Sequence, residues 1–336
     1  MTQMTSEPSV QPSATTQTGL DASRRPYIWV NGQLVPKDQA SVSVFDHGLL
    51  YGDGIFEGIR VYNGKIFKCE QHMDRLIDCC NKIFIDIESH YSRQEIVDIQ
   101  RRCIEANGIT NGYIRLVVTR GAGTLGLNPY QCPVPGLICI ADSISLFTPE
   151  MYEKGMRVVV ANRPKTPIEC LDPRIKTLNY LNNIMAKCEA IHLGKKMGIT
   201  DASEQLLEVI MLNTEGKVAE GSGDNIFYIK DGKVFTPPSD VGILEGITRR
   251  FVKDKLCPQC DIEIEEKYFE LSDLLDADEI FLTGSAAEII AVREILQHKD
   301  LEVLSTHTIS DGEGPITKKL RSKFREIVTS DNVPED

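Results

Sequence analysis

The sequence predicts a mixed α+β protein of two domains, in which a small α+β domain precedes a larger, strand-rich, barrel-like domain. Three observations support this prediction. The chain has 336 residues, about twice the size of a common single domain. Its first half alternates hairpin signals with two amphipathic helical patterns. Its second half contains a long run of short strands and tight turns, which is typical of a barrel or a strongly curved sheet.

The expected domain boundaries follow shifts in composition. Residues 1–25 are rich in Thr, Ser, Gln and Pro and are predicted to form a disordered tail. The small α+β domain is expected over residues 26–142. A less regular stretch, residues 143–153, is the expected interdomain linker. The large domain is then expected over residues 154–329, and residues 330–336 resemble the first tail.

Hairpin and strand signals mark the small domain. Two β runs surround Asn31-Gly32 and two more surround Asn63-Gly64, and Asn-Gly pairs are a common two-residue hairpin turn. Residues 113–119 begin with alternating apolar and polar side chains, as a half-buried strand does. Residues 136–141 are uniformly apolar, as a fully buried strand is.

Two helices are expected between these strands. Residues 71–87 carry apolar side chains spaced three or four apart, which predicts an amphipathic helix. A second helix is expected over residues 92–107. Ser92 is its N-cap, Glu95 stands at the capping-box position and Gly108 ends it.

The large domain is expected to combine strands with two helices. Residues 156–162 and 279–283 are expected strands, and residues 206–235 are expected to contain strands and turns throughout. Helices are expected over residues 179–193 and 248–256.

The composition excludes several classes of function. The formal net charge of −12 opposes binding to nucleic acid or to anionic membranes, because both require a basic surface. No apolar run approaches the roughly 20 residues of a membrane span. The ten cysteines are irregularly spaced and follow no secretory signal, so a reduced, cytoplasmic protein is expected. Cys257-Pro-Gln-Cys260 stands alone and is interpreted as a turn, so no metal site is expected.

Lys176 and Glu220 suggest a specific chemistry. Lys176 is expected at the start of a helix, where the positive end of the helix dipole disfavours a cation. Together with burial, this placement would favour the neutral amine that a Schiff base requires. Gly221 and Gly223 flank Glu220 and would let a cofactor approach it closely. Taken singly, either side chain could equally lie on the surface. Together they are what pyridoxal 5′-phosphate requires: a Schiff-base lysine and an acid that pairs with its pyridine nitrogen.

Two glycine-containing loops could hold a phosphate. Gly246, Ile247 and Thr248 stand at a predicted helix start, where free N–H groups and the helix dipole favour an anion. Thr248 could equally be a simple N-cap. Residues 284–287 follow a strand and have the same small-residue character. Residues 121–126 match GxGxxG, but no helix follows, so a mobile loop over a pocket is expected there instead of a dinucleotide site.

These segments together resemble the class IV (fold type IV) pyridoxal-phosphate enzymes, and most closely the branched-chain amino acid aminotransferases. The similarity runs in order from about residue 27 to about residue 323. The motifs that carry it are Tyr51-Gly, Phe56-Glu-Gly-Ile-Arg60, His72-Met-Asp-Arg75-Leu, Tyr113-Ile-Arg115, Lys176 with Asn179-Tyr180, Glu220-Gly-Ser-Gly-Asp-Asn-Ile-Phe, Gly246-Ile-Thr248-Arg and Gly284-Ser-Ala-Ala-Glu-Ile.

The resemblance implies a cofactor site. Lys176 would carry the cofactor as a Schiff base and shuttle the proton, and Glu220 would keep the pyridine nitrogen protonated. Tyr180 would hydrogen-bond the phenolic oxygen. The groups implied to hold the phosphate are Arg75, the backbone N–H groups of Ile247 and Thr248, and Ser285.

The resemblance also implies a substrate site. Tyr113 and the loop Ser285-Ala286-Ala287 would receive the α-carboxylate. Tyr51 and Arg115 would take the distal carboxylate of glutamate or 2-oxoglutarate. Phe56 and Gly58 would line a pocket for an apolar side chain. Arg60 is also expected among the substrate-binding residues.

The implied activity is reversible transfer of the amino group of L-leucine, L-isoleucine or L-valine to 2-oxoglutarate. Because such sites lie between the domains and receive a loop from a partner subunit, a homodimer or higher homo-oligomer is expected. The sequence departs from the family pattern in four places. The interval from Lys176 to Tyr180 is one residue shorter than in many branched-chain enzymes, Ser285 stands where threonine is common, and Glu245 replaces a frequent proline. The tail before Tyr27 has no counterpart in the family.

Three alternatives share the implied fold: a D-amino acid aminotransferase, an (R)-selective amine transaminase and an aminodeoxychorismate lyase. Pyruvate release from aminodeoxychorismate without an amino acceptor would indicate the lyase. A non-catalytic protein of the same fold would be expected to lack Lys176 or Glu220, and both are present.

Overall fold

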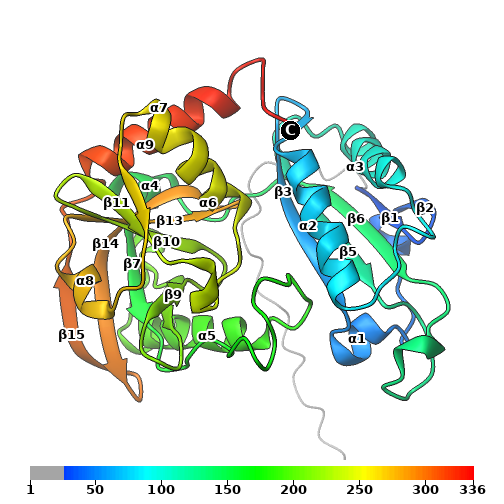
Figure 1. Ribbon diagram of the computed structural model, residues 1–336, viewed down its shortest axis with the longest axis horizontal. Coiled ribbons are helices and arrows are strands. Elements are labelled where there is room, and N and C mark those ends of the chain that lie inside the picture. Colours follow the sequence, from blue (N-terminus) through cyan, green and yellow to red (C-terminus); the bar gives the residue numbers. More distant parts are fainter. Residues whose placement is uncertain (1–25) are drawn as a thin grey trace, which may run out of the picture.

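A computed structural model describes residues 26–336 as two lobes joined side by side (Figure 1). The smaller lobe contains the N-terminal part of this range and the larger lobe contains the rest. The predicted tail at residues 1–25 lies outside the described residues. Within the described range, no helix combines the length and apolar character needed to cross a membrane.

A six-stranded antiparallel sheet forms the small lobe, in the order β2-β1-β6-β5-β3-β4. Asn31-Gly32 and Asn63-Gly64 turn its two hairpins with positive φ angles, as predicted. The strands are β1 (Tyr27–Val30), β2 (Gln33–Pro36), β3 (Gly54–Tyr62), β4 (Lys65–Ile66), β5 (Gly112–Thr119) and β6 (Gly136–Asp142).

Helices α2 (Cys69–Lys82) and α3 (Arg93–Asn107) cover this sheet and share its apolar core. The capping box predicted at Ser92 and the left-handed Gly108 that ends α3 are both present. The prediction that α2 continues to residue 87 was wrong. The helix stops at Lys82, and the chain turns through Phe84 at φ 59°. The apolar residues Ile85 and Ile87 are still buried, which explains why the helical pattern seemed to continue.

A nine-stranded curled sheet forms the large lobe and confirms the predicted mixed fold with a curved, strand-rich second domain. Its order is β12-β11-β10-β13-β14-β7-β8-β9, and β15 pairs with β14. The strands are β7 (Met156–Val160), β8 (Glu208–Leu212), β9 (Val218–Glu220), β10 (Asn225–Lys230), β11 (Lys233–Thr236), β12 (Ile264–Glu266), β13 (Glu279–Gly284), β14 (Glu288–Lys299) and β15 (Glu302–Thr308).

The helices of the large lobe differ in detail from the predictions. Helix α5 begins at Leu181 and runs to Lys196, so Lys176 precedes it by a full turn. The helix expected over 248–256 begins one residue earlier and changes to a π-helical turn from Val252 to Leu256. The α-helices of this lobe are α4 (Pro149–Lys154), α5 (Leu181–Lys196), α6 (Ile247–Phe251), α7 (Cys257–Gln259), α8 (Leu271–Leu275) and α9 (Pro315–Val328).

Helix α4 lies within the segment predicted to be a linker. Thr148 caps it by accepting a hydrogen bond from the Met151 N–H. Met151 is completely buried in a core that includes Ile290 and Val292 of β14. This part of the segment is therefore fixed to the large lobe.

The C-terminal segment is ordered against the small lobe, and its resemblance to the N-terminal tail was misleading. Val333 is buried in a core that also contains Phe67 and Phe324. The Lys68 N–H donates to the Pro334 carbonyl at 2.8 Å. A single apolar residue in a polar segment gives no periodic signal, so the sequence did not indicate this docking.

Candidate active site

Lys176 lies where a segment of the large lobe crosses the edge of the small-lobe sheet. Thr177 forms an isolated antiparallel bridge with Ile55 of β3. The Phe56 N–H donates to the Lys176 carbonyl at 3.0 Å. On its other side, the Lys176 N–H donates to the Cys79 sulfur at 3.4 Å. Lys176 is therefore held by strand-like pairing and not at a helix start, which corrects the expectation that the dipole of a helix acts on it.

The Lys176 amine is enclosed by aromatic rings. Its Nζ donates to the Tyr180 hydroxyl at 3.1 Å and lies 4.4 Å from the centre of the Phe56 ring. Burial, and after it the positive charge of Arg75, lowers the pKa of Lys176 to about 8. The amine is thus much more often neutral near physiological pH than an ordinary lysine, which favours its use as a nucleophile.

Arg75 is held by a carboxylate that sequence reasoning had assigned no role. Glu57 of β3 is 1% exposed and accepts from Arg75 Nε at 2.7 Å and from Arg75 Nη2 at 2.8 Å. His72 Nδ1 lies 2.7 Å from the same carboxylate. The Arg75 charge and then that of His72 hold the pKa of Glu57 far below its usual range, although burial opposes this.

A signal for Glu57 was present in the sequence. Ile55, Ile59 and Val61 lie at every second position of β3 together with Glu57, so they share its face of the strand, and all three are almost completely buried. A carboxylate on a buried strand face requires a cationic partner, and Arg75 provides it. Arg75 Nη1 also donates to the Glu245 carbonyl at 2.9 Å, which fixes the guanidinium beside the start of α6.

Glu220 is held on both of its carboxylate oxygens. Oε1 lies 2.5 Å from Lys165 Nζ. Oε2 accepts from Asn225 Nδ2 at 3.1 Å and from the Leu244 N–H at 3.0 Å. Lys165 is buried and was not among the predicted site residues, because an isolated lysine after a strand carries no sequence signal. Tyr180 and Glu220 line the same small cavity beside Lys176.

A cavity of about 190 Å³ brings together many of the predicted residues. Its wall includes Lys176 and contributions from both lobes. The predicted residues that line it are Gly58, Arg75, Tyr113, Lys176, Ile247, Thr248, Ser285 and Ala286. Thr283 also lines it, and its buried hydroxyl has no hydrogen-bond partner among residues 26–336.

Two further predicted residues lie next to this cavity. The Phe56 ring packs against Tyr180, with ring centres 5.0 Å apart. The Arg115 guanidinium lies 4.5 Å from the centre of the Phe56 ring and 5.8 Å from that of Tyr113. Arg115 and the Lys176 amine therefore both lie close to the same aromatic ring, that of Phe56.

Three predicted substrate residues are placed differently. Arg60 lines a neighbouring cavity, which shares Ala286 with the first, and donates to Glu288 Oε1 at 2.9 Å. Ala287 is completely buried, and its carbonyl accepts a hydrogen bond from a tyrosine hydroxyl. Tyr51 lies outside the cavity, at the end of α1 (His47–Tyr51), and its hydroxyl donates to the Leu125 carbonyl at 2.6 Å.

Three charged residues line the main cavity that were not predicted to belong to a site. They are Lys187 on α5, Glu208 at the start of β8, and Asp224 before β10. Asp224 occurs within the Glu220-to-Phe227 motif, but its side chain carried no assignment. Their spacing in sequence is irregular, so only the fold brings them together.

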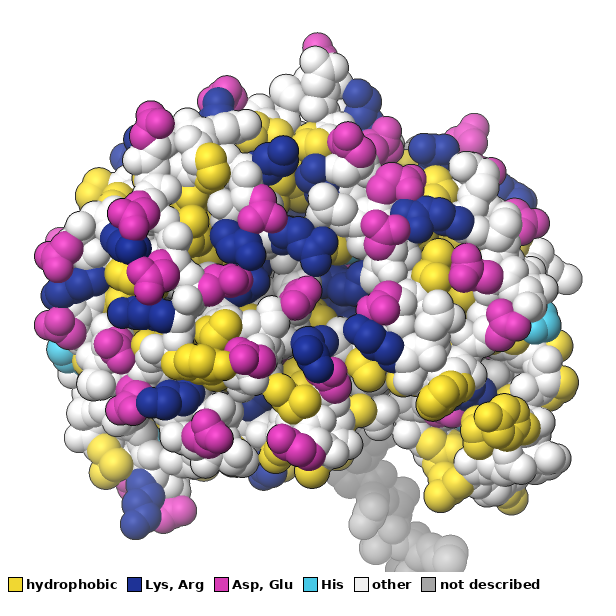
Figure 2. Space-filling view, in the orientation of Figure 1, with side chains coloured by type: hydrophobic (Ala, Val, Ile, Leu, Met, Phe, Trp, Pro, Cys, Tyr) yellow, Lys and Arg dark blue, Asp and Glu magenta, His cyan; other side chains and the backbone are white. Residues whose placement is uncertain are grey.

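Positive side chains gather near the centre of one face of the molecule, where the two lobes meet (Figure 2). The chain as a whole is acidic, so this gathering is local. Such a concentration of cations can attract an anionic ligand to the junction of the lobes.

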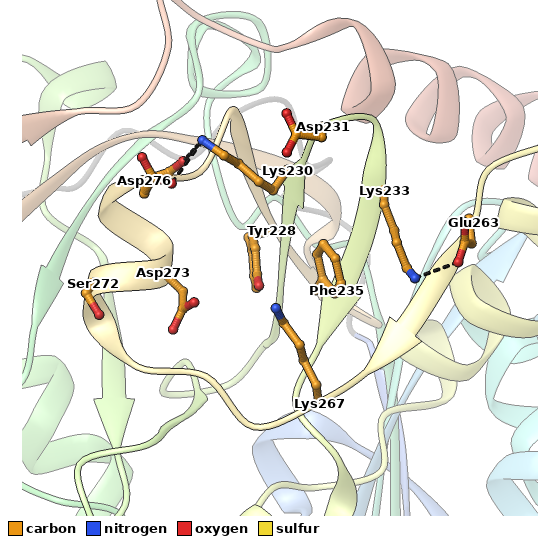
Figure 3. Close-up of a pocket in the computed structure, with 10 residues that line it drawn as sticks. All are labelled: Tyr228, Lys230, Asp231, Lys233, Phe235, Glu263, Lys267, Ser272, Asp273 and Asp276. Atoms are coloured by element: carbon orange, nitrogen blue, oxygen red, sulfur yellow. Dashed lines mark hydrogen bonds and ion pairs between the residues drawn. The ribbon is translucent and has the colours of Figure 1, made fainter.

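A larger pocket of about 610 Å³ lies elsewhere, beside β10 and β11 (Figure 3). Its lysines are neutralised locally: Lys230 lies 3.0 Å from Asp276, and Lys233 lies 2.5 Å from Glu263. Lys267 rests on the Phe235 ring at 4.2 Å. A side-chain hydrogen bond raises the pKa of each of these three lysines, so the pocket lacks the enclosed amine of lowered pKa that distinguishes the Lys176 cavity.

Comparison with known proteins identifies relatives over almost the whole chain. A "Putative branched-chain-amino-acid aminotransferase" of Methanocaldococcus jannaschii is 43% identical over 302 residues, covering 90% of this chain and 96% of that protein. A D-alanine aminotransferase of Staphylococcus aureus is 32% identical over 308 residues, covering 91% of this chain and 99% of that protein.

Solved structures give the same result. The Escherichia coli branched-chain amino acid aminotransferase superimposes with a TM-score of 0.81 at 30% identity, covering 93% of this chain and 97% of that one. The branched-chain amino acid aminotransferase of T.th., solved with pyridoxamine 5′-phosphate, has a TM-score of 0.79 at 30% identity and covers 93% and 96%.

The family model described as "Amino-transferase class IV" matches residues 54–295. This range extends from the first residue of β3 into β14 and includes every group that surrounds the Lys176 amine. Class IV aminotransferases are enzymes that use pyridoxal 5′-phosphate. The match, together with the relatives above, establishes that this chain belongs to the class IV aminotransferase family.

Proposed function

We propose that the protein is a branched-chain amino acid aminotransferase, which uses pyridoxal 5′-phosphate to transfer an amino group between L-leucine, L-isoleucine or L-valine and 2-oxoglutarate. The single observation that carries the proposal is the enclosed Lys176 amine, whose pKa is lowered to about 8 in a cavity lined by both lobes. The names of the M. jannaschii and E. coli relatives support the choice of branched-chain substrates.

The residues present suit this cofactor. The cavity offers Arg75, the N–H groups of Ile247 and Thr248 at the start of α6, and Ser285 for a phosphate. The buried Thr283 hydroxyl has no partner among the described residues and could bond a ligand. Position 284 in the cavity wall requires glycine, because a Cβ there would lie only 2.1 Å from the Asp224 carboxylate.

Each group around Lys176 has a role in the proposed reaction. The bound cofactor supplies an electron sink that stabilises negative charge at the substrate Cα. Lys176 Nζ would move the proton, because its lowered pKa lets the amine both accept and release one near neutral pH. Tyr180 orients this amine through the hydrogen bond at 3.1 Å. Glu220 would pair with the pyridine nitrogen, since each of its oxygens can accept a further hydrogen bond.

The substrate side chain would lie among Phe56, Gly58 and Tyr113. A Cβ at Gly58 would come within 1.7 Å of the Tyr113 hydroxyl, so glycine is required for this tyrosine to lie across β3. Phe56 provides apolar surface for a branched aliphatic chain. Arg115, next to the Phe56 ring, would bind the distal carboxylate of 2-oxoglutarate.

We propose that the protein acts as a homodimer or a higher homo-oligomer. Tyr51 and residues 121–126 do not line the cavity of their own chain. The loop that contains residues 121–126 is fixed to α1, because His47 Nε2 lies 2.7 Å from the Thr124 carbonyl and the Tyr51 hydroxyl donates to the Leu125 carbonyl. Tyr51 could therefore reach a substrate only in the cavity of a partner subunit.

One assay tests the substrate and the stereochemistry together. Purified protein with pyridoxal 5′-phosphate is given L- or D-amino acids with 2-oxoglutarate, and glutamate formation is measured. We expect turnover with L-leucine, L-isoleucine and L-valine. D-Amino acid transfer is the second candidate, because the S. aureus relative is named a D-alanine aminotransferase. Turnover of D-alanine alone would replace our proposal with that activity, and pyruvate release from aminodeoxychorismate would indicate a lyase.

Replacement of Arg115 by alanine tests the assignment of the distal carboxylate. We expect the KM for 2-oxoglutarate to rise by roughly tenfold or more, because a charge-assisted hydrogen bond is lost. The KM for branched-chain 2-oxo acids, which lack that carboxylate, should change much less. An equal rise for both classes of acid would show that Arg115 shapes the pocket and does not select the substrate.

A further inference from the structure

The Asp224 carboxyl is an unusual feature of the cavity wall. Asp224 is almost fully buried, since only 7% of its surface is exposed, and its side chain lines the same cavity as Lys176. No group among residues 26–336 forms a hydrogen bond with its carboxyl oxygens. Oδ1 faces Gly284, where a Cβ would lie 2.1 Å away. An unpartnered carboxylate is costly in such a place, so a proton on Asp224 is favoured.

Glu208 lies in the same wall but is bonded quite differently. Its Oε1 accepts hydrogen bonds from the Ser222 N–H at 2.6 Å and from its neighbour Val209 at 2.9 Å. Its Oε2 lies 3.7 Å from Lys187 Nζ. Both Glu208 oxygens therefore have polar partners within the protein. Of the two carboxyls, Asp224 is the one whose oxygens lack a hydrogen-bond partner among residues 26–336.

The charges that face Asp224 also affect whether its carboxyl holds a proton. Burial, and after it the negative charge of Glu208, raises the pKa of Asp224 to about 7. The negative charge of Glu220, on β9, contributes to this rise, whereas the charges of Lys187 on α5 and of Lys176 oppose it. Asp224 is thus poised to gain or lose a proton near neutral pH, beside the groups that would hold an anionic cofactor.

We propose that Asp224 carries a proton in the wall of the cofactor cavity, beside Glu208 and Lys187, and that pyridoxal phosphates bind tightly only while this proton is present. The inference rests on the cofactor assignment made above. Its physical basis is that a phosphate in this cavity is negatively charged. A second carboxylate charge in the same enclosed space would repel it.

Binding and protonation are therefore linked. A bound phosphate makes the loss of the Asp224 proton harder, so that rising pH weakens cofactor binding by the same coupling. Asp224 is a positioning residue in this scheme, because it acts through the charge of the cavity and not on the reacting atoms.

The test measures the affinity of the full-length protein for pyridoxamine 5′-phosphate by equilibrium dialysis, from about pH 6 to about pH 9. This form of the cofactor carries an amine and cannot form a Schiff base with Lys176, so attachment chemistry does not enter. In the unmodified protein we expect the affinity to fall at least about fivefold across this range through the Asp224 step. In Asp224→Asn, the part of this decrease in affinity that comes from deprotonation of Asp224 should be absent.

Two further variants should shift the pH at which the cofactor affinity falls, and they should shift it in opposite directions. Glu208→Gln keeps an oxygen for the Ser222 N–H and removes a negative charge, so it should lower the pKa of Asp224 and shift the fall to lower pH. Lys187→Met removes a positive charge and should shift it to higher pH. These opposite shifts test the proposal even if Asp224→Asn does not fold.

The outcomes separate this inference from the proposed function. If the unmodified protein binds no pyridoxamine 5′-phosphate at any pH, the cofactor assignment and this inference both fail. If it binds, but Asp224→Asn keeps the full fall with pH, or the other two variants shift in the same direction, only this inference is overturned.

Discussion

Lys176 combines a strand-like backbone with a side chain enclosed by aromatic rings and a neighbouring cation. Its pKa of about 8 follows from that enclosure and from the Arg75 charge. The shorter interval from Lys176 to Tyr180 does not separate the two groups, because their Nζ and hydroxyl atoms lie 3.1 Å apart. The residue can therefore serve both as the point of cofactor attachment and as a base.

Lys176→Ala should abolish transamination while the protein stays folded. We expect kcat to fall by at least about 10⁴-fold, since the variant loses both attachment and proton transfer. In the unmodified protein, the rate of attachment to pyridoxal 5′-phosphate should rise with pH and level off above about 8, because only the neutral amine attacks. Stopped-flow absorbance measures this rate and circular dichroism checks the fold. Substantial turnover by the variant would refute the assignment.

Glu57→Ala should destabilise the protein strongly, because it leaves the largely buried Arg75 without its carboxylate counter-ion. Loss of one partner of a buried pair costs about 3–5 kcal/mol. The matched control is Glu70→Ala on α2, where Glu70 forms an exposed pair with Arg93. That change should cost less than about 1 kcal/mol. Urea unfolding measures both free energies, and similar losses would contradict the role given to Glu57.

The contribution of Glu57 also depends on pH in a defined direction. Arg75 and His72 lower the pKa of Glu57 in the folded state. The stabilisation should therefore be complete above the unfolded value of about 4.3 and be lost as the pH falls below it. The difference in unfolding free energy between the unmodified protein and Glu57→Ala should stay constant near neutral pH and shrink in acid.

At the scale of elements, the start of α6 depends on glycine. A Cβ at Gly246 would lie 2.0 Å from Asn225 Oδ1. The Asn225 amide holds both Glu220 and the Leu244 carbonyl, so Gly246→Ala should displace this support. Crowding of this kind costs about 1–3 kcal/mol. Cofactor affinity, measured by fluorescence titration, should fall roughly tenfold to a hundredfold.

Gly194→Ala in α5 is the matched control for Gly246→Ala. A Cβ at Gly194 would meet Leu206 at 3.6 Å, an ordinary contact. Alanine inside a helix should stabilise the protein by up to about 1 kcal/mol and leave cofactor affinity unchanged. If both variants lost cofactor equally, the close contact at Gly246 would not be the cause.

The sequence predicted elements with strong local signals. The Asn-Gly hairpins and the capped helix α3 follow from turn and cap chemistry, which involves only neighbouring residues. The family resemblance supplied several residues that meet in the cavity, but some groups that act through long-range contacts were not found. Lys165 reaches Glu220 from a distant part of the chain, and Asp224 and Glu208 line one cavity only because the fold of the large lobe brings them together. No local pattern specifies such pairs.

At the scale of the whole molecule, the cavity depends on the junction of the two lobes. The strand-like segment at Lys176 pairs with β3 of the small lobe, and Arg75 of the same lobe reaches the start of α6. The C-terminal segment adds a second connection through Val333 and the backbone of Lys68. Because the site draws on both lobes, neither lobe alone could provide it.

The loop that follows β5 leaves apolar side chains in solvent. Leu125, Leu127 and Tyr130 are 69%, 79% and 82% exposed in the isolated chain, and Tyr51 anchors the loop through Leu125. We call these three exposed residues the loop patch. Clustered apolar groups of this kind mark an interface more often than free surface. The loop patch is therefore the expected contact with the partner subunit.

Leu127→Asp should weaken the proposed dimer, because the interface would have to bury an unpaired carboxylate. Size-exclusion chromatography with light scattering should show a shift to monomer at low protein concentration. Activity should fall together with the dimer, since Tyr51 would no longer reach the partner's cavity. The control is Leu304→Asp on β15, an exposed leucine of the large lobe at 67%. That variant should remain dimeric and active; if Leu127→Asp does so too, the loop patch does not form the interface.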